Sequence, residues 1–214
     1  QGINFTMART NGRGDDNDSE KITYFTPRFQ GFQLGVSYVP QLSQDADAAP
    51  NDNDGTRDDG FAIGANFQQS FGDVKVEVST GYQDFGDDDA LNNNGPESYN
   101  VAVRVGFSGF TVAGGYGIED RANIVAGQNK DGQQETWHMG VAYGMGPWGV
   151  SLGWIGAEIE KGADQGQDVF ELGAKYTMGP GIDLKGSILY GEHETNGVKD
   201  AEGFAVVAGL ALGF

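Results

Sequence analysis

Apolar and polar residues alternate along most of the chain from Lys21 onward, in short runs separated by turns. Successive side chains of an extended strand point to opposite faces, so this alternation predicts strands with one apolar and one polar face. About eleven such runs are present. They are Ile22–Arg28, Phe32–Val39, Phe61–Gln68, Val74–Tyr82, Tyr99–Phe107, Phe110–Ile118, Trp137–Tyr143, Trp148–Ile155, Phe170–Met178, Ile182–Tyr190 and Phe204–Phe214. The sequence therefore predicts an all-β protein.

The connections between these runs alternate in length. The tight ones are Gln30-Gly31, Phe71-Gly72, Ser108-Gly109, Gly146-Pro147 and Gly179-Pro180-Gly181. The long polar ones are Gln41–Gly60, Gln83–Glu97, Glu119–Glu135, Glu158–Asp168 and Glu192–Gly203. Short turns on one rim and long loops on the other are typical of outer-membrane barrels. We therefore predict a transmembrane antiparallel up-and-down β-barrel.

The alternation also assigns the two faces of the predicted barrel. In the fourth run Val74, Val76 and Val78 share one face, whereas Lys75 and Glu77 share the other. We assign the apolar face to lipid. Aromatic residues stand at the ends of the apolar rows: Phe32 and Tyr38, Phe61 and Phe67, Phe110 and Tyr116, Trp137 and Tyr143, Trp148 and Trp154, Phe170 and Tyr176. Aromatic rings with polar tips prefer the two membrane interfaces, so we expect two aromatic girdles.

Composition narrows the possible classes of protein. Hydrophobic residues make up 38% of the 214 residues, and the mean hydropathy is -0.43. No apolar run approaches the roughly 18 residues of a membrane-spanning helix, which excludes a helical membrane protein but not a barrel with alternating strands. The net charge of -18 argues against binding to nucleic acid, because phosphates would be repelled. The absence of cysteine is compatible with an oxidising periplasm.

Seven charged residues fall on the polar face and are our candidates for lining a pore. They are Lys75, Glu77, Arg104, Glu171, Lys175, Asp183 and Lys185. Fixed charges on the wall of a pore select among ions, and Arg104 is the strongest candidate for such a role. The alternative is that these charges are merely solvated in a wide channel.

Metal and catalytic signals are weak. Carboxylates crowd the first long loop, where Asp52, Asp54 and Asp58 are candidates for weak Ca²⁺ binding, although the register of an EF-hand is missing. No other cofactor is expected. Gly149–Gly153 fits the letters of a nucleophile elbow, but it lies inside an alternating run instead of a strand-turn-helix. His138 and His193 are the only histidines, which leaves little material for a histidine-based catalytic triad. We therefore predict that the protein is not an enzyme.

Two segments carry a resemblance to a known family. Lys21–Pro40 reads KITYFTPRFQGFQLGVSYVP, and the last strand reads GFAVVAGLALGF with a terminal aromatic. Both resemble general porins of alphaproteobacteria. The resemblance implies a homotrimer of sixteen-stranded barrels in the outer membrane, in contact with the lipid bilayer and lipopolysaccharide. It also implies that the outer-membrane assembly machinery recognises Phe214. It also implies a passive, water-filled diffusion channel for ions and small hydrophilic solutes. The alternative function is a small barrel with a structural or adhesive role carried by its acidic loops.

The number of strands departs from this family. About eleven strands is odd, whereas single-chain bacterial barrels have an even number. One explanation is that residues 21–214 are the barrel strands of the C-terminal two-thirds of a longer porin. Residues 1–20 would then end the constriction loop that such porins fold into the lumen, with Asp15, Asp16 and Asp18 opposite the basic wall. A solvated extracellular loop is the alternative for Asn11–Glu20. The alternative is that the alternating segment Gly2–Arg9 is an extra strand that closes a twelve-stranded barrel.

Overall fold

A single antiparallel sheet makes up the described part of the chain. The computed structural model describes residues 21–41, 58–84, 86, 97–121, 132–160 and 164–213. Each strand pairs with its neighbours in the sequence, in the order β1 to β11. The strands are β1 (Ile22–Phe25), β2 (Phe32–Gln41), β3 (Asp58–Phe71), β4 (Val74–Asp84), β5 (Glu97–Phe107), β6 (Phe110–Arg121), β7 (Gly132–Met145), β8 (Trp148–Glu160), β9 (Gln165–Gly179), β10 (Ile182–Thr195) and β11 (Val198–Leu212). The predicted all-β, up-and-down arrangement is confirmed.

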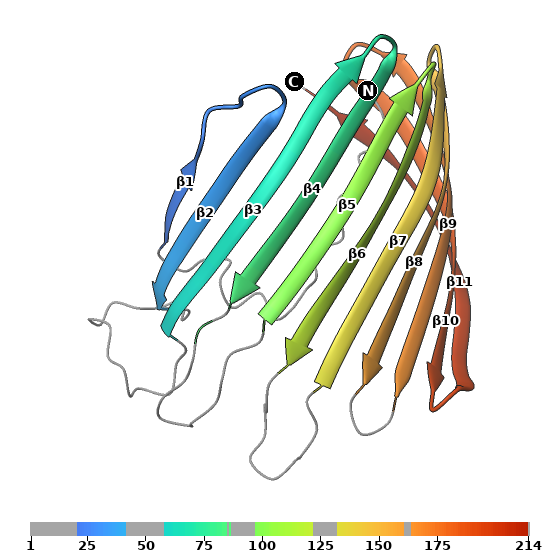
Figure 1. Cartoon of the computed structure of the whole chain (residues 1–214). Coiled ribbons are helices and arrows are strands. Elements are labelled where there is room, and N and C mark those ends of the chain that lie inside the picture. Colours follow the sequence, from blue (N-terminus) through green and yellow to red (C-terminus); the bar gives the residue numbers. More distant parts are fainter. Residues whose placement is uncertain are drawn as a thin grey trace.

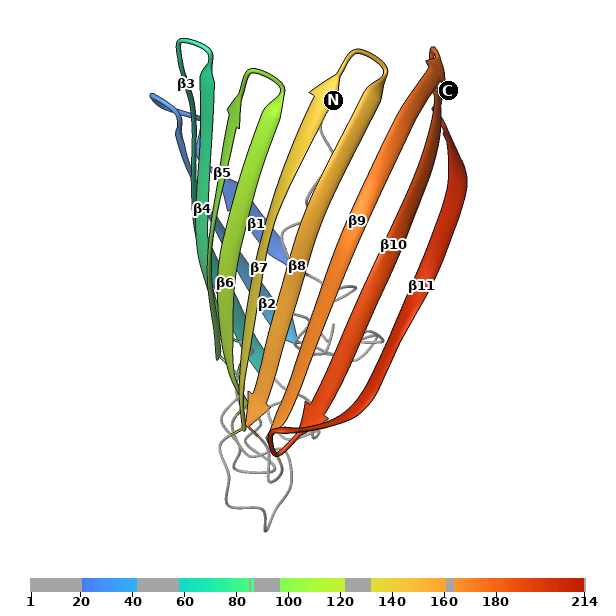
Figure 2. The ribbon, with the colours of Figure 1, turned by 90° about the vertical axis from the view of Figure 1, so that its right-hand side faces the viewer.

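The sheet curls into a deep trough. Figures 1 and 2 show long, tilted strands, with the turns that join β3 to β4, β5 to β6, β7 to β8 and β9 to β10 at the same end of the sheet. Among the described residues β1 and β11 do not pair with each other, so the two edges of the sheet stay apart. The described part is therefore a partial barrel with a concave and a convex face. In that same part of the chain, no helix is long and apolar enough to cross a membrane.

The strands extend beyond the predicted runs at their long-loop ends. The prediction of a long loop over Glu192–Gly203 is wrong, because β10 and β11 stay paired to Thr195 and Val198. Asn196 and Gly197, with φ values of 51° and 73°, form the two-residue turn between them, as expected of an Asn-Gly hairpin. Outside the membrane both faces of a strand meet water, so the alternation that marks strands is lost there.

Two further boundaries differ from the predictions. The predicted loop Glu158–Asp168 is mostly strand, since β8 continues to Glu160 and β9 begins at Gln165. The first strand is shorter than predicted and ends at Phe25. After it, Thr26 N–H still donates to Leu34 O at 2.9 Å, so the chain follows β2 without regular pairing.

Gly181 is the most constrained of the turn glycines. Its φ of +72° is strained for other residues, and a Cβ at this position would collide with the backbone carbonyl of Gly213. Its own carbonyl accepts a hydrogen bond of 2.8 Å from Gly213 N–H. The turn between β9 and β10 therefore also holds the end of β11.

We expect Gly181→Ala to lower the free energy of unfolding by about 1–2 kcal/mol from the left-handed backbone alone, and further through the clash with Gly213. Urea titration of the folded protein in vesicles measures this loss. Gly146→Ala is the matched control for backbone strain, because Gly146 has a φ of +57° but open space around it. Gly179→Ala, with open space and no positive φ, should be near neutral. Equal stability of all three variants would contradict the role given to Gly213.

The convex face is apolar and carries two rows of aromatic rings. The rings nearest the tight turns pair as Phe32–Phe67, Phe110–Tyr143 and Trp148–Tyr176, with centroids 4.3–4.7 Å apart. The rings nearest the long loops pair as Phe61–Tyr82, Tyr82–Tyr99 and Tyr116–Trp137, at 4.8–6.3 Å. Aliphatic side chains fill the band between the rows and remain exposed, as for Val103 (46%) and Leu172 (57%). This pattern matches a lipid-facing band between two aromatic girdles.

A row of carboxylates follows the loop-side girdle on the same convex face. Each strand from β3 to β11 contributes one, in the order Asp59, Asp84, Glu97, Asp120, Glu135, Glu158, Asp168, Glu192 and Glu202. Girdle residues donate to several of them, including Trp154 Nε1–H to Asp168 at 2.6 Å and Tyr99 O–H to Glu97 at 3.1 Å. Ionised carboxylates avoid hydrocarbon. The row therefore marks where the apolar band ends on the loop side.

Candidate functional site

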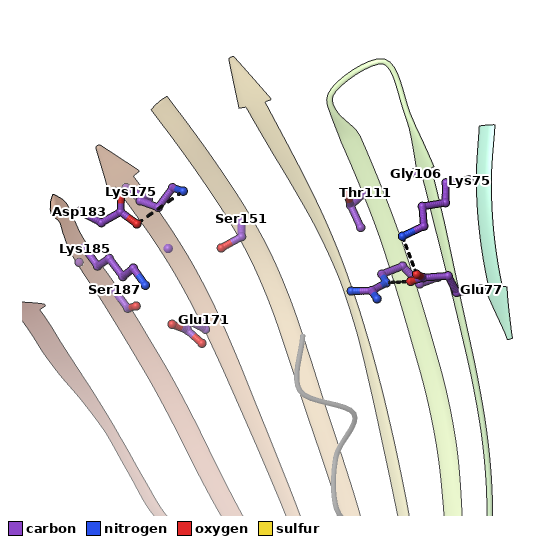
Figure 3. Close-up of a pocket in the computed structure, with 14 residues that line it drawn as sticks. Lys75, Glu77, Gly106, Thr111, Ser151, Glu171, Lys175, Asp183, Lys185 and Ser187 are labelled. Atoms are coloured by element: carbon purple, nitrogen blue, oxygen red, sulfur yellow. Dashed lines mark hydrogen bonds and ion pairs between the residues drawn. The ribbon is translucent and has the colours of Figure 1, made fainter. Parts of the chain in front are cut away.

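The concave face gathers all seven predicted charges around one cavity of about 910 Å³. Lys75, Glu77 and Arg104 come from β4 and β5, whereas Glu171, Lys175, Asp183 and Lys185 come from β9 and β10. Figure 3 shows Lys75 and Glu77 on one side of the trough and Glu171, Lys175, Asp183 and Lys185 on the other, with their side chains directed into it. The structure thus brings together residues that are separated in the sequence by up to about half of the chain, as Lys75 and Lys185 are.

Strand register explains why these charges lie at the same level. Glu77 is directly opposite Arg104 in the pairing of β4 with β5, and Lys185 is directly opposite Lys175 in the pairing of β10 with β9. Directly opposite residues of an antiparallel pair share a face. All of these positions lie closer to the tight turns than to the long loops. The cavity therefore occupies the tight-turn half of the trough.

The charges on β4 and β5 are held together by Glu77. Its carboxylate accepts a hydrogen bond from Arg104 Nε–H, and its other oxygen lies 2.8 Å from Lys75 Nζ. The Glu77 side chain is only 12% exposed, whereas those of Lys75 and Arg104 are 61% and 40% exposed. The two cations therefore remain available to solutes, while the anion between them is largely covered.

The charges on β9 and β10 are less tightly paired. Lys175 Nζ lies 3.8 Å from Asp183 Oδ2, and the other oxygen of Asp183 accepts a hydrogen bond of 2.7 Å from Thr177. Lys185 and Glu171 make no hydrogen bond or ion pair with any other described residue. Both side chains are exposed to the cavity.

Small and hydroxylic residues line the wall between the two charged groups. Thr111, Ser151 and Ser187 present hydroxyls to the cavity, and Gly106, Gly173 and Gly186 lie among them. Of these, only Ser151 belongs to a segment that the sequence singled out, the Gly149–Gly153 stretch. The same alternation that assigned Lys185 would have assigned Ser187, but a serine draws no attention without its neighbours on adjacent strands. The contacts of Arg28 across the sheet were also not predicted. It donates to Gly31 O at 2.7 Å and to Asn66 Oδ1 at 2.6 Å beside the first tight turn.

Several other candidates lie outside the described residues. These are Asp15, Asp16, Asp18, Asp52, Asp54 and Phe214. Asp58 begins β3, but its side chain is not described. In the part of the chain that the structure describes, no group of three or more potential metal ligands is present. The Ca²⁺ prediction therefore remains a prediction.

The weak catalytic signals lie apart from one another. Ser151 is a residue of the regular strand β8 and is paired with Ala142 on β7, so its surroundings are not those of a strand-turn-helix elbow. His138 lies on β7, whereas His193 lies at the loop end of β10, where its Nδ1 is 2.6 Å from Asp200 Oδ1. No nucleophile-base pair forms around Ser151 among the described residues.

The sequence itself matches the Gram-negative porin family over residues 1–197. The chain belongs to that family. A porin family member with two aromatic girdles and an apolar convex face is a protein of the outer membrane, which confirms the predicted location and fold class. No curated protein sequence matches the chain.

Solved outer-membrane proteins share the fold of this porin. The anion-selective porin from Comamonas acidovorans aligns with a TM-score of 0.60 at 17% identity, over 91% of this chain and 59% of its own. OmpT of Vibrio cholerae aligns with a TM-score of 0.58 at 12% identity, over 92% of this chain and 64% of its own. Pseudomonas aeruginosa OccK10 aligns with a TM-score of 0.59 at 10% identity, over 88% and 58%. The chain thus spans about three-fifths of the length of these relatives.

Proposed function

We propose that this porin forms a passive, water-filled diffusion channel for ions and small hydrophilic solutes. The observation that carries the proposal is the division of one curved sheet into two faces. The convex face is an apolar band between aromatic girdles, whereas the concave face carries Lys75, Glu77, Arg104 and their counterparts on β9 and β10. A barrel of such strands leaves a polar lumen through which solutes diffuse without a cofactor or an energy source.

Membership of the family and the similarity of fold support this proposal. Charged rings inside a pore bias the passage of ions by sign. Lys75 and Arg104 present more exposed surface to the lumen than the carboxylate that links them. We therefore infer a lumen whose β4–β5 wall favours anions. The Comamonas relative of the same fold is named as anion-selective.

The test is single-channel recording of the protein in planar bilayers. We expect stable current steps whose reversal potential in a salt gradient depends on the lumen charges. The natively folded protein should also resist SDS at room temperature and change mobility on boiling, because a closed barrel satisfies every backbone group internally. Heat-modifiable protein that never conducts would contradict the channel and favour a structural or adhesive role for the loops.

We further propose that the protein acts as a homotrimer among lipid and lipopolysaccharide, and that Phe214 directs its assembly. Support comes from family membership and from the terminal aromatic of the sequence. Crosslinking in intact outer membranes would test the trimer. Recovery of the monomer alone after crosslinking would contradict the trimer.

A further inference from the structure

Gly173 interrupts the charged wall of β9 and β10 on the concave face. A Cβ at Gly173 would lie 2.6 Å from Ser151 Oγ, 3.9 Å from Glu171 Oε1 and 3.9 Å from Ser187 Oγ. The Ser151 hydroxyl therefore occupies the space that a side chain at Gly173 would fill, and the Ser187 hydroxyl and the Glu171 carboxylate lie beside it. We call these three polar groups the Gly173 cluster. All of these residues line the cavity of the concave face (Figure 3).

The strand register builds this cluster. Ser151, Gly173 and Ser187 are directly opposite one another across β8, β9 and β10, so they form one row on the concave face. Lys185 stands on the tight-turn side of the row, and Glu171 stands on the loop side. A cation and an anion thus flank a row of small hydroxylic residues.

Pairing separates these two charges from the other five of the cavity. Lys75, Glu77 and Arg104 form one ion-paired group, and Lys175 pairs with Asp183. Glu171 and Lys185 have opposite signs and lie on adjacent strands, yet they pair neither with each other nor with any other described residue. Both charges are therefore free to contact a solute in the lumen.

We propose that the Gly173 cluster, together with Lys185, is a subsite for zwitterionic α-amino acids. The ammonium group of the solute donates hydrogen bonds to Glu171 and to the hydroxyls of Ser151 and Ser187, and Lys185 donates to the carboxylate of the solute. A neutral sugar could donate hydrogen bonds to Glu171 and the serines but has no anionic group to pair with Lys185. A simple anion could pair with Lys185 but has no cationic group to pair with Glu171. The subsite rests on the proposed channel function and adds a solute preference to it.

Liposome swelling with the protein purified from outer membranes tests the subsite. L-glutamine and L-arabinose are the probes, because they are similar in size but only glutamine is a zwitterion. We expect the ratio of glutamine to arabinose rates to fall about two- to fivefold in Glu171→Gln and in Lys185→Gln, as for the loss of one solvated ion pair. Gly173→Ala keeps every charge but displaces the Ser151 hydroxyl from the cluster, so it should also lower the ratio.

Two further variants separate this proposal from a general effect of charge. Lys199→Gln removes the same charge from the convex rim, where Lys199 pairs with Glu192, and should leave the ratio unchanged. The double variant Glu171→Lys with Lys185→Glu keeps both charges in exchanged places, so the ratio should recover because the solute can reverse.

The outcomes distinguish the subsite from the channel. A wild-type protein that admits neither solute overturns the proposed function itself. A conducting protein whose ratio is unaffected by Glu171→Gln and Lys185→Gln overturns the subsite alone. An effect of Glu171→Gln without any effect of Lys185→Gln indicates recognition of hydroxyls and also overturns the zwitterion proposal.

Discussion

Val103→Lys is expected to prevent most of the protein from folding into a bilayer. Val103 lies on the convex face of β5, midway between Tyr99 and Phe107 of the two girdles, and is opposite Val78 and Gly114. Its position therefore corresponds to the middle of the apolar band. A lysine at the bilayer midplane costs about 2–4 kcal/mol. Urea titration in lipid vesicles, followed by the heat-modifiable band, measures this loss.

Ala102→Lys is the matched control, because it places the same side chain one residue away on the opposite face. Ala102 is directly opposite Ser79 and Gly115, on the concave side of the sheet. There the ammonium group meets the aqueous lumen, so the free energy of unfolding should change by less than about 1 kcal/mol. If Ala102→Lys fails to fold and Val103→Lys folds, the assignment of the two faces is inverted.

Arg104→Glu is expected to raise the cation-to-anion permeability ratio about five- to thirtyfold. The substitution changes the lumen charge by two units, and each unit contributes on the order of 0.5–1 kcal/mol across a few ångströms of water. It also breaks the ion pair of Arg104 with Glu77 and leaves Lys75 as the remaining described partner of that carboxylate. The reversal potential in a KCl gradient measures the ratio.

Two comparisons make the Arg104 experiment specific. The effect should shrink at high salt, because ions screen charges in an aqueous lumen. Lys199→Glu also changes the charge by two units, but Lys199 lies on the convex rim, 2.6 Å from Glu192. It should therefore leave the permeability ratio nearly unchanged. A shift as large as that of Arg104→Glu would mean that net charge, and not lumen position, sets the selectivity.

The fold was predictable because a strand with lipid on one face and water on the other has alternating apolar and polar residues in its sequence. Val74, Val76 and Val78 alternate with Lys75 and Glu77, and this pattern gave both the existence of β4 and the direction of its side chains. All eleven predicted strands are present. The pattern failed at Glu192–Gly203, where both faces of the hairpin are wet and polarity no longer distinguishes strand from loop.

The sequence by itself determined the strands, their order and the faces on which Arg104 and Lys185 lie. Alternation is a local property, so it needs no knowledge of neighbouring strands. Only the tertiary structure decided which side chains meet. The pairing of Glu77 with two cations, and the convergence of Ser151, Ser187 and Glu171 over Gly173, depend on register between strands and on the curvature of the sheet. Register arises from contacts between segments far apart in the chain, and no single run of residues contains it.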